Sequence, residues 1–127
     1  MQANACSCPL LGSGVQNLVL VFLGGGLGAS LRYGVSLAVP GHWGTWVVNV
    51  LGSFGLGLIL SHPAFGDPRL RLILGTGLMG GFTTYSTFNA DTLRLVQEGQ
   101  AGLAAFNVVG TLALCLGAGA LGLWLGR

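Results

Sequence analysis

The sequence has 127 residues, of which 52% are hydrophobic and only 6% are charged, whereas roughly 25% of the residues in a soluble domain are charged. So few charged side chains do not cover a water-exposed surface, and the composition predicts an integral membrane protein. The formal net charge of +2 comes from scattered arginines, which excludes the clustered basic face that nucleic acids require. The expected partner is the lipid bilayer, and no nucleic acid is expected to bind.

Four apolar segments run through residues 15–38, 43–60, 70–95 and 101–125. Each is close to the roughly 20 residues with which a helix crosses a bilayer, and short connectors rich in proline, glycine and polar residues separate them. The pattern predicts an all-α, multi-pass membrane protein with four transmembrane helices in one domain, residues 15–127. Residues 1–14 lack the basic start and apolar core of a signal peptide, and we expect a disordered tail there.

The 24 glycines of the chain are poor helix formers in water, but in lipid they let helices pack closely. Small residues recur at four-residue spacing on three of the expected helices: Gly24 and Gly28, Ser53 and Gly57, Ala113 and Gly117. Packing surfaces on so many helices of a small protein favour an oligomer.

The arginines are almost evenly divided between the two sides of the expected helices. Four spans place both termini on one side, with Arg69, Arg71 and Arg127, and leave Arg32 and Arg94 on the other. Cytoplasmic loops normally carry a clear excess of basic residues. The weak excess here permits insertion in both orientations, and therefore an antiparallel dimer.

The third apolar segment contains an unusual stretch near its middle, GGFTTYSTF at residues 80–88. Glycine and threonine make a weak helix at a depth where backbone groups find no water. One interpretation is a broken helix whose freed carbonyls and amides build an ion site. The other is an intact helix whose hydroxyls bond to carbonyls one turn earlier, and the stretch alone does not distinguish the two.

Polar side chains on the neighbouring segments favour the first interpretation. Thr45, Asn49 and Ser53 share one face of the second helix, as Asn107 and Thr111 do on the fourth. The Asn49 carboxamide is costly in lipid unless it bonds to another helix or to a ligand, and both alternatives remain open.

These groups share a preference for negative charge. The amide hydrogens of Asn49, the hydroxyl hydrogens and the positive ring edges of Tyr85 and Phe88 all attract anions without carrying a full charge. A pore lined in this way binds an ion weakly enough to release it. The expected cargo is a small anion.

Three blocks of the sequence, GGGLGASLRY at residues 24–33, GTWVVNVLGSF at residues 44–54 and GLMGGFTTYSTF at residues 77–88, resemble the signatures of the Fluc fluoride channels, also called the CrcB family. Their order and spacing agree, and the resemblance covers nearly everything from residue 15 onward. It implies an antiparallel, dual-topology homodimer with the third helix broken near the midplane. It also implies two passive fluoride pores, selective against chloride, that export cytoplasmic fluoride.

The resemblance also implies roles for particular residues. A structural Na⁺ at the dimer interface is expected to be held by the backbone carbonyls of Gly80 and Thr83. Arg32 matches a vestibule arginine. The residues that match or adjoin the fluoride pore are Asn49 as a donor, Tyr85 and Phe88 with their ring edges, Ser86 and Thr87 on a hydroxyl track, and Thr45 on the face of Asn49.

The sequence departs from the family pattern in two regions, the third segment and the fourth. Tyr85 stands where the family usually has phenylalanine. On the fourth helix, Phe106 and Gly110 align with positions that are commonly tyrosine and serine in the family. With this alignment two hydroxyl groups are absent, and Asn107 and Thr111 supply the missing polarity.

The strongest alternative is an exporter of the small multidrug-resistance type, which also has four short helices. Such exporters need a membrane-embedded glutamate in the first helix, and this first segment contains no acidic residue. The only carboxylate within an expected span is that of Asp91. An enzyme is not expected, because Ser86 has no histidine or lysine in its segment to activate it.

Overall fold

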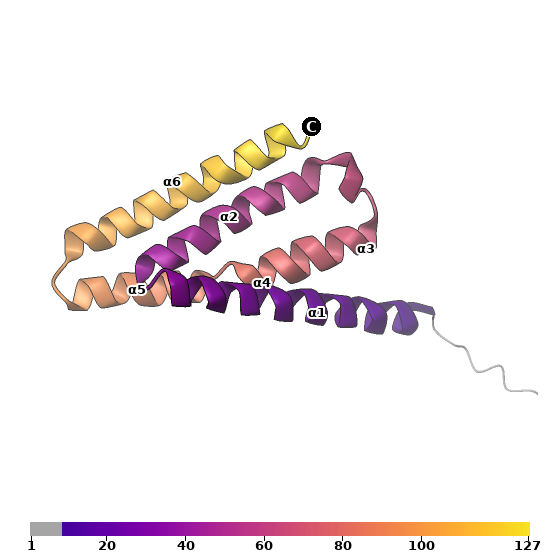
Figure 1. Ribbon diagram of the computed structural model, residues 1–127, viewed down its shortest axis with the longest axis horizontal. Helices are drawn as coiled ribbons and strands as arrows, with labels where there is room; N and C mark the ends of the chain where they lie inside the picture. Colours follow the sequence, from indigo (N-terminus) through magenta and orange to yellow (C-terminus); the bar gives the residue numbers. More distant parts are fainter. Residues whose placement is uncertain (1–8) are drawn as a thin grey trace, which may run out of the picture.

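The structure is a computed structural model that describes residues 9–127, and these residues form helices and turns without a β-strand. The structure has three long helices, α1 (Pro9–Ala38), α2 (His42–Ser61) and α6 (Ala101–Leu125). A segmented third passage lies between α2 and α6 in the chain, and successive passages run in opposite directions (Figure 1). Helix α1 begins at Pro9, so residues 9–14 of the expected tail are helical. Residues 1–8 of that tail lie outside the described part of the chain.

The third passage is divided into short elements. It begins with η1 (Pro63–Phe65) and α3 (Pro68–Arg71), continues as the π-helical η2 (Leu72–Met79) and α4 (Gly80–Phe82), and ends with α5 (Tyr85–Gln97). Asp67 caps α3, since its side chain accepts from the Arg69 amide at 2.7 Å. The wider π-turns occur often at functional sites, and they lead here directly to the residues between α4 and α5.

Three helices are long and apolar enough to cross a membrane by length and composition: Ser13–Ala38 within α1, together with α2 and α6. The third passage does not qualify as one such helix because it is split among its short elements. The described residues thus fit a multi-pass membrane protein in which the third passage differs from the other three.

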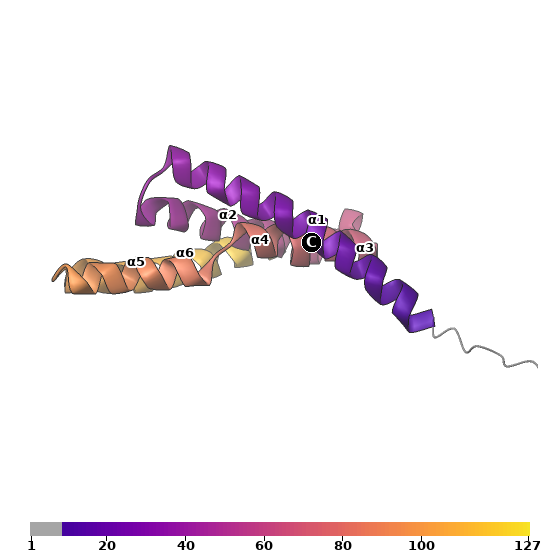
Figure 2. The same ribbon diagram turned by 90° about the horizontal axis from the view of Figure 1, so that it is seen from below.

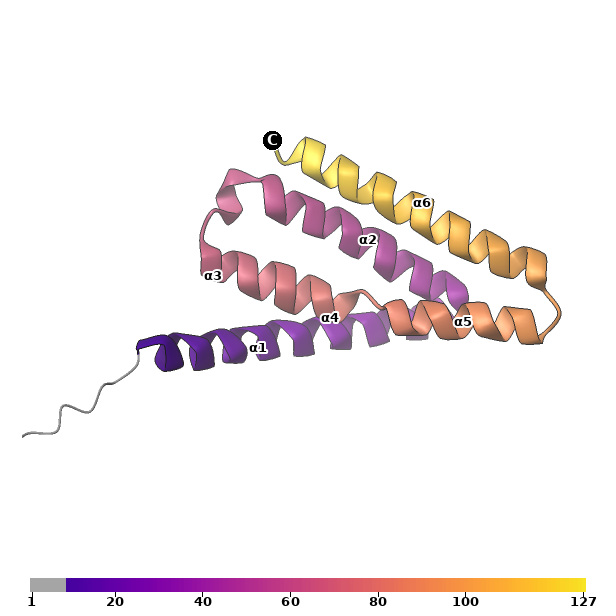
Figure 3. The ribbon, with the colours of Figure 1, turned by 180° about the vertical axis from the view of Figure 1, so that it is seen from behind.

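The helices pack in layers, with α2 lying along α6 and α1 lying along η2 and α4 (Figures 2 and 3). Glycines allow the close approach. A Cβ atom on Gly28 of α1 would collide with the Leu78 carbonyl oxygen, and one on Gly57 of α2 with the Gly119 carbonyl oxygen of α6. A Cβ on Gly117 would meet nothing within 4 Å, so α6 packs on α2 through Gly119 and Gly122 instead of the expected surface at Ala113 and Gly117.

The apolar surface of the structure faces outward, whereas much of the buried interior is polar. Large apolar side chains such as Phe22 and Leu116 are 77% and 67% exposed, which suits a protein whose surroundings are lipid or a second subunit. The buried polar side chains are those of Thr45, Asn49, Thr84, Asn107 and Thr111. They come from α2, α6 and the segment between α4 and α5, and they mark where the site lies.

Candidate functional site

Thr83 and Thr84, called the linker below, leave the helical conformation between α4 and α5. Their backbone dihedrals are extended, with φ −78° and ψ 157° at Thr83 and φ −150° and ψ 114° at Thr84. Thr84 is the N-cap of α5, and its hydroxyl oxygen accepts from the Thr87 amide at 3.2 Å. Threonine is a favoured N-cap because it satisfies an amide that has no helical partner. The linker therefore has a local sequence cause as well as tertiary support.

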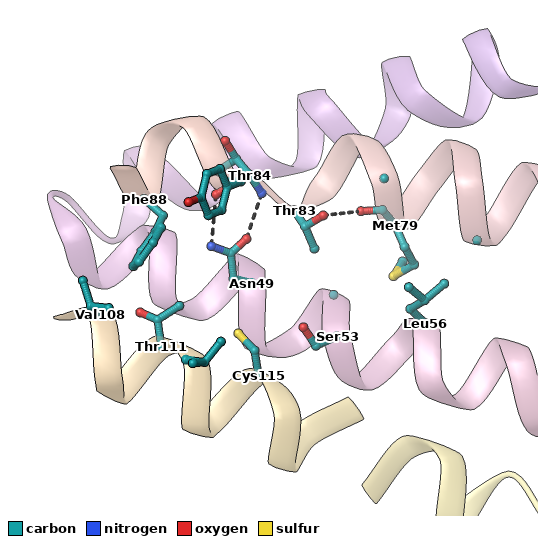
Figure 4. A pocket seen from close by; sticks show the side chains of 15 residues that line it. Asn49, Ser53, Leu56, Met79, Thr83, Thr84, Phe88, Val108, Thr111 and Cys115 are labelled. Carbon is teal, nitrogen blue, oxygen red and sulfur yellow. Dashed lines mark hydrogen bonds between the residues drawn. The ribbon is translucent and has the colours of Figure 1, made fainter. Parts of the chain in front are cut away.

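Asn49 of α2 binds the backbone of the linker through both ends of its carboxamide. Its Oδ1 accepts from the Thr84 amide at 2.8 Å, and its Nδ2 donates to the Thr84 carbonyl at 3.1 Å (Figure 4). Because a carboxamide has two N–H donors, one Nδ2 hydrogen remains for another acceptor. Of the two alternatives for Asn49, the structure contains the bond to another segment and leaves capacity for a ligand.

The linker changes which carbonyls are occupied. In a continuous helix the Thr84 amide would donate to the Gly80 carbonyl, but here it donates to Asn49, so the Gly80 carbonyl loses that partner. The Thr83 carbonyl accepts from Nη1 of Arg32 at 3.2 Å. Arg32 thus supports the linker from α1, while Asn49 supports it from α2.

A cavity of about 490 Å³, called the linker pocket below, lies against the linker between α2, the third passage and α6. Its lining includes Asn49, Gly80, Thr83, Thr84, Tyr85, Phe88, Thr111 and Cys115. None of its lining residues carries a formal charge. Figure 4 shows Asn49, Phe88, Thr111 and Cys115 around this space.

Helix α6 contributes Thr111 to the lining of this pocket. Thr111 is 7% exposed, and its Oγ1 has no hydrogen-bond partner within residues 9–127. A buried polar atom without a partner is costly, so this hydroxyl is a candidate hydrogen-bonding group beside the pocket. The thiol of Cys115, one turn further along α6, lies beside it in the lining; the sequence pattern did not single it out.

Phe106 and Gly110, the departures from the family pattern on α6, both contact Trp46 of α2. Phe106 is 54% exposed and stacks on the Trp46 ring with centroids 5.5 Å apart, and Gly110 lies against the same ring. Asn107 is 1% exposed and bonds both the Trp46 indole and the Thr92 hydroxyl. The inward-facing polar positions are therefore Asn107 and Thr111, not Phe106 and Gly110.

The two aromatic residues expected to line the path are neighbours. The ring centroids of Tyr85 and Phe88 lie 5.7 Å apart with an interplanar angle of 46°, and both residues line the linker pocket. Tyr85 is 78% exposed in the single chain. Ser86 is exposed, and its hydroxyl lies 3.2 Å from that of Thr84, but it lines neither this pocket nor the next one.

A second cavity of about 380 Å³, called the charged pocket below, is lined by Arg32, Thr45, Thr84, Thr87, Asp91 and Arg94 with their neighbours. Thr84 lines both cavities, so the linker lies between them. The Thr45 hydroxyl donates to Oδ2 of Asp91 at 2.7 Å. The structure therefore places Thr45 and Thr87 with Arg32, on the other side of the linker from Phe88 and Thr111.

The fold and this site define a multi-pass α-helical membrane protein with a polar interior where its third passage is interrupted. The family described as CrcB-like protein, Camphor Resistance (CrcB), matches residues 19–123. The chain belongs to this family, as its three sequence blocks predict.

Curated relatives cover most of the chain. "Fluoride-specific ion channel FluC" of Shewanella sp. (strain ANA-3) is 47% identical over 112 residues, which are 80% of this chain and 89% of that protein. "Fluoride-specific ion channel FluC 1" of Streptomyces avermitilis is 41% identical over 120 residues, which are 88% of this chain and 97% of that protein. These names describe ion channels, and the prediction that the chain is not an enzyme agrees with its family.

Proposed function

We propose that this protein is a passive, fluoride-selective ion channel of the cell (inner) membrane through which cytoplasmic fluoride leaves. The observation that carries the proposal is a pair of buried residues with neutral donors, Asn49 and Thr111, that line the linker pocket. Asn49 has one amide hydrogen to spare, and the Thr111 hydroxyl has no partner among the described residues. The names of the curated relatives support fluoride as the ion.

The chemistry of the linker pocket suits a small anion that must also depart. Neutral amide and hydroxyl donors replace part of the hydration shell without the strong binding of a full charge. The ring edge of Phe88 adds positive electrostatic potential from its quadrupole. The N-terminus of α5 lies at the pocket, since Thr84 and Tyr85 both line it, and the positive end of a helix dipole favours an anion.

The proposed path joins the two cavities at the linker. An anion enters the charged pocket beside Arg32 and Thr45, passes the hydroxyls around Thr84 and reaches the linker pocket beside Phe88. The hydroxyls of Thr84, Ser86 and Thr87 are mutually close, with Thr84 donating to Thr87 at 3.0 Å. Along this path Ser86 and Thr87 form the hydroxyl track. The Thr45 hydroxyl donates its hydrogen bond either to Asp91 or to the passing anion.

The functional unit we propose is an antiparallel, dual-topology homodimer with two pores and with the linker near the bilayer midplane. The exposed Tyr85 ring of α5 and the outward apolar surface supply contacts for a second copy, and the nearly even arginine distribution permits both orientations. Reporter fusions at the C-terminus check this topology, and a signal from only one side of the membrane would contradict it.

We also propose a structural Na⁺ at the dimer interface, held by the carbonyl oxygens of Gly80 and Thr83 from both copies. The donor type fits, since carbonyl oxygens suit hard cations and the Gly80 carbonyl is released by the linker. The Thr83 carbonyl has a second lone pair beside the one that Arg32 uses. When bound, Na⁺ would supply positive charge that stabilises the interface. Replacing sodium by a large organic cation should therefore weaken the dimer. An unaltered dimer would contradict the assignment.

Fluoride flux from liposomes tests the proposed function directly. Pure protein in liposomes should release trapped fluoride down its gradient, as read by a fluoride electrode, and should carry chloride poorly. Liposomes without protein provide the baseline. Fluoride release no faster than this baseline, or equal rates for chloride, would refute a fluoride-selective channel.

The alternative is a small multidrug-resistance-type exporter. Such an exporter requires an acidic residue in its first helix, but α1 of this protein contains no aspartate or glutamate. Asp91, the carboxylate nearest the linker, lies on α5 and accepts from Thr45. Proton-coupled efflux of cationic dyes from the same liposomes would favour that alternative.

A further inference from the structure

The charged pocket holds three formally charged side chains, those of Arg32, Asp91 and Arg94. Two cations and one anion leave this cavity with a net charge of +1 when all three are ionised. The linker pocket beyond it carries no charge. An anion that moves from water toward the linker therefore meets its strongest attraction before it reaches the neutral donors.

The three charged groups are held differently. Arg32 donates to the Thr83 carbonyl, and Asp91 accepts from the Thr45 hydroxyl. Arg94 is exposed in the last turn of α5, and no carboxylate within residues 9–127 forms a salt bridge with it. Among the three charged side chains of this pocket, Arg94 is therefore the one whose charged group has no hydrogen-bonded or ion-paired partner among the described residues.

The position of Arg94 along α5 gives it a separate task from Arg32. Arg94 lies ten positions after the Thr84 cap, which corresponds to about 15 Å along the helix axis. Arg94 therefore lies toward the end of α5 that leads to the connector, whereas Arg32 lies at the linker itself. The two arginines mark the outer and inner parts of one cavity.

We propose that Arg94 attracts small anions into the charged pocket and so sets how fast they reach the linker when their concentration is low. This inference rests on the proposed function and adds a residue that none of the three sequence blocks contains. An exposed charge raises the local concentration of the opposite ion, and added salt screens the effect. Arg94 acts here without binding the anion at the linker.

Single-channel currents in planar bilayers test the proposal, with low fluoride and an impermeant salt that sets the ionic strength. Arg94→Gln should lower the current about threefold at ~10 mM ionic strength, where the screening length is about 30 Å, and the difference should vanish near 1 M, where it is about 3 Å. Arg94→Lys keeps the charge and should restore the wild-type current. Arg69→Gln is the matched control, because Arg69 lies on α3 and lines neither the charged pocket nor the linker pocket.

The outcomes separate three cases. A current in Arg94→Gln that equals wild type at low salt overturns the proposal. A loss of the same size at every ionic strength also overturns it, because this indicates a structural defect. Absence of any fluoride current in the wild type refutes the proposed function itself, and the role of Arg94 falls with it.

Discussion

Replacing Asn49 by aspartate is expected to reduce fluoride flux at least about a hundredfold. The substitution keeps the shape of the side chain and the oxygen that accepts from the Thr84 amide, but it removes both Nδ2 hydrogens. The Thr84 carbonyl and the passing anion then face a carboxylate where each had a donor. Losing a buried donor costs about 1–3 kcal/mol, and repulsion between like charges adds to this. Fluoride release from liposomes measures the effect.

Asn89→Asp is the matched control for this experiment. Asn89 is exposed on α5 and lines neither pocket, so the same chemical change there should leave the flux within about twofold of wild type. Size-exclusion chromatography of both variants establishes whether assembly is intact. Wild-type flux in a well-assembled Asn49→Asp protein would remove Asn49 from the anion path.

Phe88→Ile is expected to reduce fluoride flux about tenfold or more while the protein still assembles. Isoleucine keeps an apolar side chain against the linker pocket but has no positive ring edge, and aromatic pairs contribute about 0.5–1.5 kcal/mol. The pair with Tyr85, whose ring centroid lies 5.7 Å away, is lost as well. Flux and chromatography on the same preparation measure the two properties.

Phe22→Ile makes the same change on the outward face of α1, where Phe22 is 77% exposed. Its flux should match the wild type, because Phe22 lines neither pocket. Equal flux in the Phe88 and Phe22 variants would mean that the Phe88 ring has no part in conduction.

The helix positions follow closely from the sequence because hydrophobicity and breakers determine them. The second segment was expected at residues 43–60 and is α2, His42–Ser61; the fourth was expected at residues 101–125 and is α6 with the same limits. The course of the third passage was less predictable. It contains π-helical turns, and bonds from Arg32 and Asn49, which lie far away in the sequence, hold its two extended residues.

The sequence predicts Asn107 and Thr111 as the polar face of α6, but it does not predict the contacts that turn this face inward. Phe106 and Asn107 are neighbours, and one residue along a helix turns the side chain by about 100°. Which of them faces inward depends on Trp46, whose ring covers Gly110 and Phe106 and whose indole bonds Asn107. No local pattern contains that contact between α2 and α6.

The location of the anion path is tested most directly by modifying Cys115, which lines the linker pocket. In a protein with Cys6 and Cys8 replaced by serine, a small methanethiosulfonate reagent should add to Cys115, as mass spectrometry verifies, and should abolish fluoride flux. The Cys115→Ser protein, treated in the same way, should keep its flux. Complete modification of Cys115 with undiminished fluoride flux would contradict a path through the linker pocket.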